Sequence, residues 1–172
     1  MADAMTLEPT RRDFLYIATG AVGAVGVGGV VWPLISQMNP DASTLALAST
    51  EVDIGGIAEG QIVTIKWRGR PVFVRHRTKA EIDAAVKDDS ADLKDPQPDA
   101  ARAKKPEWLI VQGVCTHLGC VPLGHQGDYD GWFCPCHGSV YDTSGRIRRG
   151  PAPANLAVPP YVFETDTKVK IG

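Results

Sequence analysis

The chain begins with one long apolar segment and continues with short alternating ones. Residues 14–35 contain no charged side chain. At about 1.5 Å per residue, a helix of this length reaches roughly 33 Å, enough to cross the hydrocarbon core of a bilayer. Trp32 and Pro33 stand at the end of the segment, where an interfacial residue is expected. The pattern predicts a single N-terminal transmembrane helix.

Beyond residue 50 the pattern changes to that of strands. Apolar and polar residues alternate through residues 61–67, and Arg68-Gly69 indicates a turn into a second strand at residues 71–75. Further strands are predicted at residues 108–111, 131–133, 161–164 and 168–171, the last two forming a closing hairpin. Short strands separated by turn signals predict an all-β domain, a small antiparallel sandwich or partial barrel.

Two segments do not follow this strand pattern. Residues 36–50 are rich in Ala, Ser and Thr and predict a flexible hinge or linker between the helix and the domain at residues 51–172. Residues 79–105 form a densely charged insertion with prolines at 96 and 98 and a third, Pro106, directly after it. A short helix is predicted at residues 80–87, with Ile82 and Val86 on one face. We expect the rest of the insertion to be solvated and without a chemical role.

Targeting signals at the N-terminus suit an exported protein. Thr10-Arg11-Arg12-Asp13-Phe14-Leu15 has the twin-arginine pattern of a Tat signal, which exports proteins already folded with their cofactor. A cleaved signal is the alternative to a retained anchor, with a cleavage site at residues 46–48, but the apolar span is long for a signal. By the positive-inside rule, residues 1–13 are expected in the cytoplasm and the large domain in the bacterial periplasm.

The predicted membrane helix has a face suited to packing against other helices. Gly20, Gly23, Gly26 and Gly29 recur every third residue, a stripe of small residues that favours packing against other membrane helices.

The charge of the chain gives a second indication about partners. The formal net charge is −2, the sequence pI is about 6.1 and the basic residues are scattered. This composition gives no sign of nucleic-acid binding.

Two short motifs carry the candidate chemistry: CTHLGC at residues 115–120 and CPCHGS at residues 134–139. Each offers one Cys-His pair, and two such pairs on two loops are the ligands of a [2Fe–2S] cluster in which imidazoles replace two thiolates. We expect Cys115 and Cys134 on the buried iron and His117 and His137 on the outer iron. Neutral imidazoles leave the cluster less negative, so the pattern predicts a one-electron carrier of relatively high potential.

The remaining cysteines, Cys120 and Cys136, lie one in each motif. They are either additional ligands or partners in a disulfide, and a disulfide would use all four cysteines and tie the loops together. Such a bridge needs an oxidising compartment, which agrees with the expected periplasmic location. A zinc site is the competing interpretation, but Cys-x-His fits zinc spacing poorly. His76 and His125 are predicted to be ordinary surface residues.

Together the motifs resemble the Rieske iron–sulfur proteins, specifically the disulfide-containing type of cytochrome bc1 and b6f complexes. The resemblance extends to GSVYD at residues 138–142 and GPAP at residues 150–153. It implies that the Ser139 hydroxyl bonds a bridging sulfide and that the Tyr141 hydroxyl bonds a ligating cysteine sulfur. It further implies that residues 150–153 cover the cluster as a third loop, in an all-β Rieske domain.

The resemblance is to the bacterial Rieske subunits of the bc1 complex, ubiquinol–cytochrome c reductase. It implies an enzyme subunit with one [2Fe–2S] cluster that takes an electron from quinol at a cytochrome b site, with a proton passing through His117 or His137. The electron then goes to cytochrome c1, which supports proton translocation in a dimeric complex of the inner membrane. The alternatives are a b6f-type or menaquinol-oxidising complex, and a soluble ferredoxin or periplasmic oxidoreductase subunit.

Overall fold

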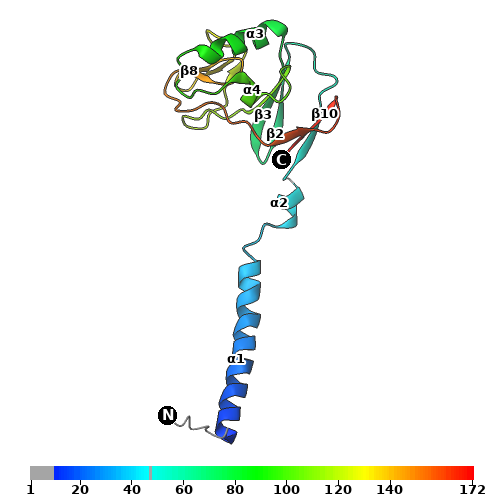
Figure 1. Ribbon diagram of the computed structural model, residues 1–172, viewed down its shortest axis with the longest axis vertical. Helices are drawn as coiled ribbons and strands as arrows, with labels where there is room; N and C mark the ends of the chain where they lie inside the picture. Colours follow the sequence, from blue (N-terminus) through cyan, green and yellow to red (C-terminus); the bar gives the residue numbers. More distant parts are fainter. Residues whose placement is uncertain (1–9, 47) are drawn as a thin grey trace, which may run out of the picture. The chain divides into compact units, whose positions relative to one another are not determined.

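The computed structural model describes residues 10–46 and 48–172, and the chain divides into two compact units, Met1–Leu45 and Ala46–Gly172. The first unit holds helix α1 (Arg11–Ser36), and the second holds all the strands (Figure 1). The predicted linker, residues 36–50, includes the boundary of the two units and is not entirely irregular, because it contains the short helix α2 (Ala42–Ala46).

Helix α1 begins where the sequence provides a cap. The Thr10 hydroxyl accepts a hydrogen bond from the Asp13 N–H, and the Asp13 carboxylate accepts one from the Thr10 N–H at 2.8 Å. This reciprocal pair satisfies two amides that a helix start leaves free. No residue of α1, all of which the structure describes, is buried, and Phe14 is 69% exposed. By length and composition α1 is able to cross a membrane, and it contains the predicted span at residues 14–35.

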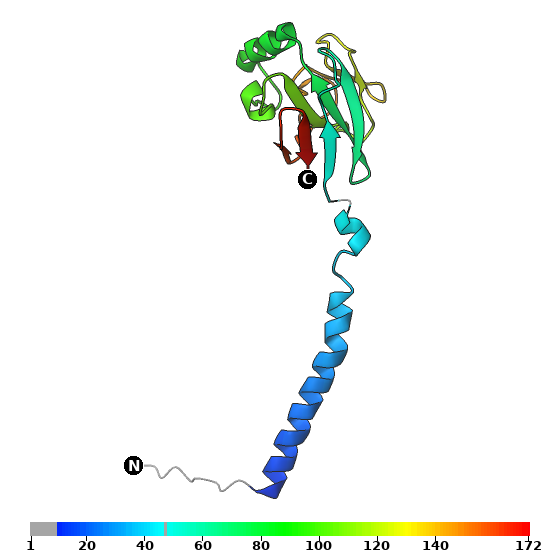
Figure 2. The ribbon, with the colours of Figure 1, turned by 90° about the vertical axis from the view of Figure 1, so that its right-hand side faces the viewer.

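Within residues 48–172 the strands form three antiparallel sheets (Figure 2). The all-β prediction and the two predicted hairpins are confirmed. The first sheet has the order β1-β10-β9, the second β2-β3-β4 and the third β5-β6-β7-β8. Their bounds are β1 (Thr50–Asp53), β2 (Ile62–Trp67), β3 (Arg70–His76), β4 (Trp108–Gln112), β5 (Leu123–Gly124), β6 (Trp132–Cys134), β7 (Ser139–Tyr141), β8 (Ile147–Arg149), β9 (Tyr161–Phe163) and β10 (Lys168–Ile171).

The turn between β2 and β3 shows why this hairpin forms. Trp67 pairs with Arg70, so the loop has two residues, Arg68 and Gly69, and both have positive φ. Two-residue hairpin loops favour such turns because their twist matches that of the strands. Alternation along β3 then buries Val72 in one apolar cluster and Phe73 in another.

These two apolar clusters divide the core. One lies between the first and second sheets, and it includes Ile54, Val74, Ile110 and Ile171. The other contacts the third sheet and includes Leu109, Trp132, Tyr141, Ile147 and both Cys115 and Cys134. The candidate cysteines therefore stand on a packed apolar base.

The insertion contains α3 (Lys79–Lys87), the 3₁₀ helix η1 (Asp88–Ser90) and α4 (Asp99–Arg102). The helix predicted at residues 80–87 is confirmed as α3. The prediction that the remainder is solvated was wrong, because Leu93, Asp99, Arg102 and Ala103 are buried. Some charges of the insertion, Asp99 and Arg102 among them, are directed inward, toward partners on the β domain.

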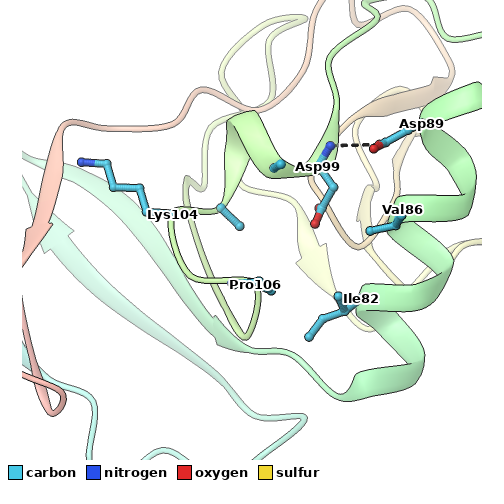
Figure 3. A pocket seen from close by; sticks show the side chains of 8 residues that line it. Ile82, Val86, Asp89, Asp99, Lys104 and Pro106 are labelled. Carbon is cyan, nitrogen blue, oxygen red and sulfur yellow. Dashed lines mark hydrogen bonds between the residues drawn. The ribbon is translucent and has the colours of Figure 1, made fainter.

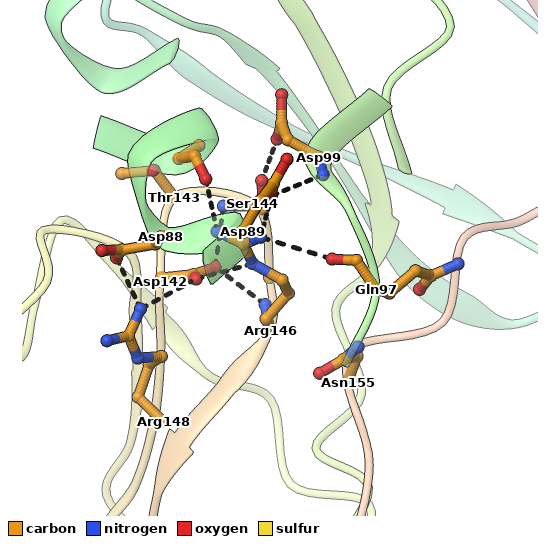
Figure 4. A network of polar contacts seen from close by, with 12 residues as sticks. Asp88, Asp89, Gln97, Asp99, Asp142, Thr143, Ser144, Arg146, Arg148 and Asn155 are labelled. Carbon is orange, nitrogen blue, oxygen red and sulfur yellow. Dashed lines mark hydrogen bonds and ion pairs between the residues drawn. The ribbon is translucent and has the colours of Figure 1, made fainter. Parts of the chain in front are cut away.

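Figure 4 shows the polar network that receives these charges. Arg146, fully buried in the turn directly before β8, donates to Asp142 at 2.8 Å, to Asp89 at 2.5 Å and to the Ala85 carbonyl at 2.8 Å. Arg102 donates to the carbonyls of Ser144 and Leu156 at 2.7 and 2.6 Å. Burial lowers the pKa of Arg102 to about 10. These bonds fasten the insertion to the turn that precedes β8.

A second buried pair joins Arg77 to Asp99, with distances of 2.6 and 3.0 Å. Burial by itself raises the pKa of Asp99, but the hydrogen bonds from Arg77 and Ser144 outweigh it and hold the pKa below its ordinary value. A carboxylate with a lowered pKa stabilises the fold above its unfolded pKa of about 3.9, and this stability is lost as the pH falls through the folded pKa.

We therefore expect the free energy of unfolding of the native chain to fall more steeply below about pH 4 than that of Asp99→Asn. At neutral pH, Arg77→Met leaves a buried carboxylate without its partner and is expected to cost about 3–5 kcal/mol. Urea unfolding of the detergent-solubilised protein, followed by circular dichroism, measures both. Asp166→Asn, at a fully exposed site, is the control. Parallel pH curves for the native chain and Asp99→Asn would contradict the assignment.

Candidate metal centre

The two motifs form two loops that close in the same way. In the loop after β4, the Gly119 N–H donates to the Cys115 carbonyl at 2.9 Å. In the loop between β6 and β7, the Gly138 N–H donates to the Cys134 carbonyl at 3.0 Å. Both glycines have positive φ, +84° and +75°, a conformation that other residues rarely adopt. Each loop thus turns a cysteine and a histidine toward the same place.

The predicted ligand residues come together with the thiols inside and the imidazoles outside. Cys115 and Cys134 are free thiols, each 2% exposed. The rings of His117 and His137 meet edge to face near the surface, with their Nδ1 atoms 3.3 Å apart. Two buried sulfur donors and two more exposed imidazoles on the same pair of loops are the donor set of a cluster with mixed ligation, and the residues present fit a [2Fe–2S] group.

Tyr141 lies beneath this site and is buried in β7. Its hydroxyl is 3.2 Å from the Cys115 sulfur and accepts a hydrogen bond from the Thr116 N–H at 3.3 Å. Burial raises the pKa of the Cys115 thiol, but the bonds from Tyr141 and from the His117 N–H outweigh it, so this pKa is lowered. Burial raises the pKa of the Cys134 thiol. Donors directed at Cys115 stabilise the thiolate, which is the form that binds metal.

The remaining two cysteines, Cys120 and Cys136, are joined in a disulfide, with their Cα atoms 6.8 Å apart. The bridge connects the two loops across a sequence separation of 16 residues. The Cys120 and Cys136 sulfurs lie close to that of Cys134. Since a bridged sulfur is not a thiolate, the available donors are two thiols and two imidazoles, and no C-x-x-C zinc pair results.

A third segment, residues 150–155, which we call the cover loop, contacts both motif loops. Gly150 has a φ of +104°, and a Cβ there would lie 2.6 Å from the Ser139 Cα, so only glycine fits. The Ala152 N–H donates to the Ser139 hydroxyl at 3.2 Å. The Thr116 hydroxyl donates to the Ala154 carbonyl at 2.6 Å. Sequence reasoning missed Thr116, because a threonine between two ligands carries no signal of its own.

The other two histidines differ from one another. The prediction that His76 is an ordinary surface residue was wrong, because its ring stacks on Trp108 at 4.2 Å between centroids and its Nδ1 is 2.8 Å from the Ile57 carbonyl oxygen. His125 is near the surface, 3.6 Å from Asp130.

A second group of possible metal ligands lies around His125, with Glu81 and Asp130 close to it. The buried guanidinium of Arg75 contacts all three of these side chains. The cation they surround is that arginine.

A groove of about 340 Å³ lies between α3 and α4 (Figure 3). Its floor includes Ile82 and Val86, the two apolar residues predicted on one face of the helix. Its lining residues are aliphatic or carry charge, and they include neither a thiol nor an imidazole: Ile82, Val86, Asp89, Asp99, Ala100, Ala103, Lys104 and Pro106. The groove therefore offers nothing to the chemistry of the two loops.

The fold and the site define an iron–sulfur protein whose cluster domain offers cysteine and histidine together. Comparison with known proteins agrees. The family model described as "Rieske [2Fe-2S] domain" matches residues 52–160. The model described as "Ubiquitinol-cytochrome C reductase Fe-S subunit TAT signal" matches residues 1–41. The chain belongs to the family of Rieske iron–sulfur subunits of ubiquinol–cytochrome c reductase, and its cofactor is a Rieske [2Fe–2S] cluster.

Relatives extend over nearly the whole chain. A protein of Blastochloris viridis named ubiquinol-cytochrome c reductase iron-sulfur subunit is 62% identical, covering 100% of this chain and 98% of the relative. A protein of the same name from Rhodospirillum rubrum is 64% identical, covering 96% and 93%. A chain of the structure titled "Hyperthermophilic respiratory Complex III" aligns with a TM-score of 0.57 at 31% identity, covering 90% of this chain and 98% of that one.

These comparisons also support two of the expectations above: membership of a complex and a membrane anchor. They support a subunit of a larger complex, since the relatives are named as such and the structural match is a complex III chain. A Tat signal domain followed by an apolar helix fits an exported, membrane-anchored protein.

The tight approach of Gly150 to Ser139 gives a test of the site. We expect Gly150→Ala to push the cover loop away from β7 and to lower the iron bound per protein by several-fold, since the clash is with backbone. Gly69→Ala is the matched control: its φ is also positive, but a Cβ there meets open space, so only about 1–2 kcal/mol of backbone strain is expected. Iron and acid-labile sulfide assays on washed membranes measure the effect. Equal iron contents in the two variants would mean that the close approach is unimportant.

Proposed function

We propose that this chain carries single electrons from quinol to a c-type cytochrome, with Cys115, Cys134, His117 and His137 as the four ligands of its cluster. The observation that carries the proposal is the arrangement of two buried thiols beneath two facing imidazoles at the surface. This arrangement supports a division in which the cysteines hold the inner iron and the histidines hold the outer, solvent-facing iron.

When bound, the cluster supplies a one-electron acceptor whose potential is raised by its neutral imidazole ligands. The chain supplies the proton chemistry. An imidazole has two nitrogens, so a histidine that binds metal through one keeps the other for a hydrogen bond. A ring that carries no proton on this second nitrogen can accept the hydroxyl proton of quinol. His117 and His137 are therefore the catalytic residues of the proposal.

The surface around the histidines suits a hydrophobic partner. Leu118 is 71% exposed, and Val121 and Leu123 are 50% and 44% exposed. Side chains this exposed do not act only as a shield over the cluster, and apolar groups gathered near a reactive tip mark a binding surface. We propose that this surface enters the quinol-oxidation pocket of cytochrome b, which would exclude water from the proton and electron transfer.

In this proposal the linker allows the cluster domain to carry its electron onward. Residues 36–50, including α2, connect the anchor to the cluster domain, and a tethered domain samples a confined volume at high effective concentration. We propose that the domain at residues 51–172 moves between cytochrome b and cytochrome c1. In this proposal residues 1–13 are cytoplasmic, residues 14–35 span the inner membrane and the cluster domain is periplasmic. The single helix also anchors the chain among lipids.

The first test is low-temperature electron paramagnetic resonance on ascorbate-reduced membranes. We expect a signal whose average g lies below that of the free electron, because histidine ligation makes the two irons unlike. An inhibitor of the quinol-oxidation site is expected to reshape this signal if the histidine tip docks at a quinol pocket. A signal that the inhibitor does not change would still show the cluster but would indicate a different electron-transfer partner. Zinc without iron would contradict the proposal altogether.

The hydroxyls of Ser139 and Tyr141 give a second test. Donors directed at cluster or ligand sulfurs stabilise the reduced form, so Ser139→Ala and Tyr141→Phe should each lower the midpoint potential and slow quinol oxidation while the cluster is retained. Redox titration of membranes measures the potential, and the signal amplitude measures retention. Tyr129→Phe, on an exposed ring that lies against Arg148, is the control. Unchanged potentials in both variants would refute the assigned hydrogen bonds.

A further inference from the structure

The cover loop is held by two sets of contacts. One set joins it to Ser139 and Thr116, as described above. The other joins it to two consecutive residues of the insertion, Lys94 and Asp95. The insertion therefore reaches the segment that contacts both motif loops, although it contains none of the proposed ligands.

Lys94 holds the first half of the cover loop through its charge. Its ammonium group donates to the Gly150 carbonyl at 2.8 Å and to the Ala152 carbonyl at 3.3 Å. Two carbonyls oriented toward one cation fix the direction of the peptide units between them. Ala152, whose carbonyl accepts a bond from Lys94, is also the residue whose N–H donates to the Ser139 hydroxyl.

Asp95 holds the second half through Asn155. The Asp95 carboxylate accepts the Asn155 backbone N–H at 2.9 Å, and its carbonyl accepts the Asn155 side-chain N–H at 3.0 Å. The Asn155 side-chain oxygen in turn accepts the Ile147 N–H at 2.9 Å. Asn155 is buried with these bonds made, so the end of the cover loop has one position.

The segment that carries Lys94 and Asp95 is itself fixed. Leu93 is buried immediately before them, and Pro96 and Pro98 restrict φ immediately after them. The Gln97 carbonyl accepts a hydrogen bond from Arg146 at 3.3 Å (Figure 4). The clamp on the cover loop is thus anchored to the same buried arginine that fastens the rest of the insertion.

We propose that Lys94 and Asp95 are positioning residues that set the reduction potential of the cluster by holding the Ala152 N–H on the Ser139 hydroxyl. A hydroxyl oxygen that accepts one hydrogen bond keeps its own O–H free to donate to another group. If that donation goes to a cluster sulfur, it stabilises the added electron, so a loosened cover loop lowers the potential. This inference rests on the proposed ligand set.

The test is a redox titration of the cluster in membranes, monitored by electron paramagnetic resonance. Lys94→Met removes both carbonyl contacts and keeps an unbranched side chain, and Asp95→Ala removes the carboxylate. For each we expect the equilibrium constant for cluster reduction to fall about threefold, which at 59 mV per tenfold is a potential about 30 mV lower. Lys87→Met and Asp92→Ala are matched controls in the same insertion and should retain the native potential. Asp95→Asn keeps an acceptor oxygen and should recover most of the native potential.

A double-mutant cycle separates positioning from a direct effect of charge. If Lys94 acts through Ser139, Lys94→Met should add no further shift in a Ser139→Ala background. An equal shift in both backgrounds would overturn the proposal, because the lysine would then act by its charge alone. Native potentials in both single variants would overturn it too, as would a loss of cluster in which the remaining clusters keep the native potential. A failure of the proposed function differs from all of these, because the unmodified protein would then lack the Rieske signal.

Discussion

The hydrogen bonds of the buried Arg146 guanidinium are the interactions on which the position of the insertion and the cover loop depends. This guanidinium reaches Asp142 within its own turn, Asp89 and the Ala85 carbonyl in the insertion, and the Gln97 carbonyl just beyond Asp95. A buried cation is costly unless every donor finds an acceptor, so these acceptors cannot move independently. Their shared partner fixes the insertion relative to β8, the strand that leads directly into the cover loop. The cover loop is therefore supported by the insertion as well as by the strands.

The site itself combines a rigid base with an exposed edge. Cys115, Cys134 and Tyr141 belong to an apolar cluster, while the histidines stand at the surface. The disulfide joins the loops that carry them, and the two glycine turns set the same local geometry on each. This arrangement places the Tyr141–Cys115 and Ala152–Ser139 hydrogen bonds in dry surroundings, where such bonds are strongest, and leaves the two imidazoles near the surface.

Local patterns predicted much of this structure, and its long-range pairing was beyond them. The hairpins, α3, the membrane-length helix and the gathering of the Cys-His pairs follow from strand alternation and turn residues, from the spacing of Ile82 and Val86, from a long uncharged stretch and from motif spacing. The inward direction of the insertion's charges did not follow, because a charged run is usually solvated and nothing local marks Asp99 as the partner of Arg77. For the same reason Lys94 and Asp95 carried no signal. His76 was misjudged because its partner, Trp108, lies on another strand.

The use of charge rather than apolar packing in the insertion has a physical consequence. Apolar side chains of similar volume are often as stabilising as buried ion pairs, so net stability is a weak reason for burying Arg77 and Arg146. A guanidinium, however, has five donors in a fixed plane and accepts only a few arrangements of its partners. Apolar contacts tolerate sliding, whereas these bonds do not. A loop whose N–H must remain on one hydroxyl gains from a support of that kind, because a small shift would break the bond while leaving the packing almost unchanged.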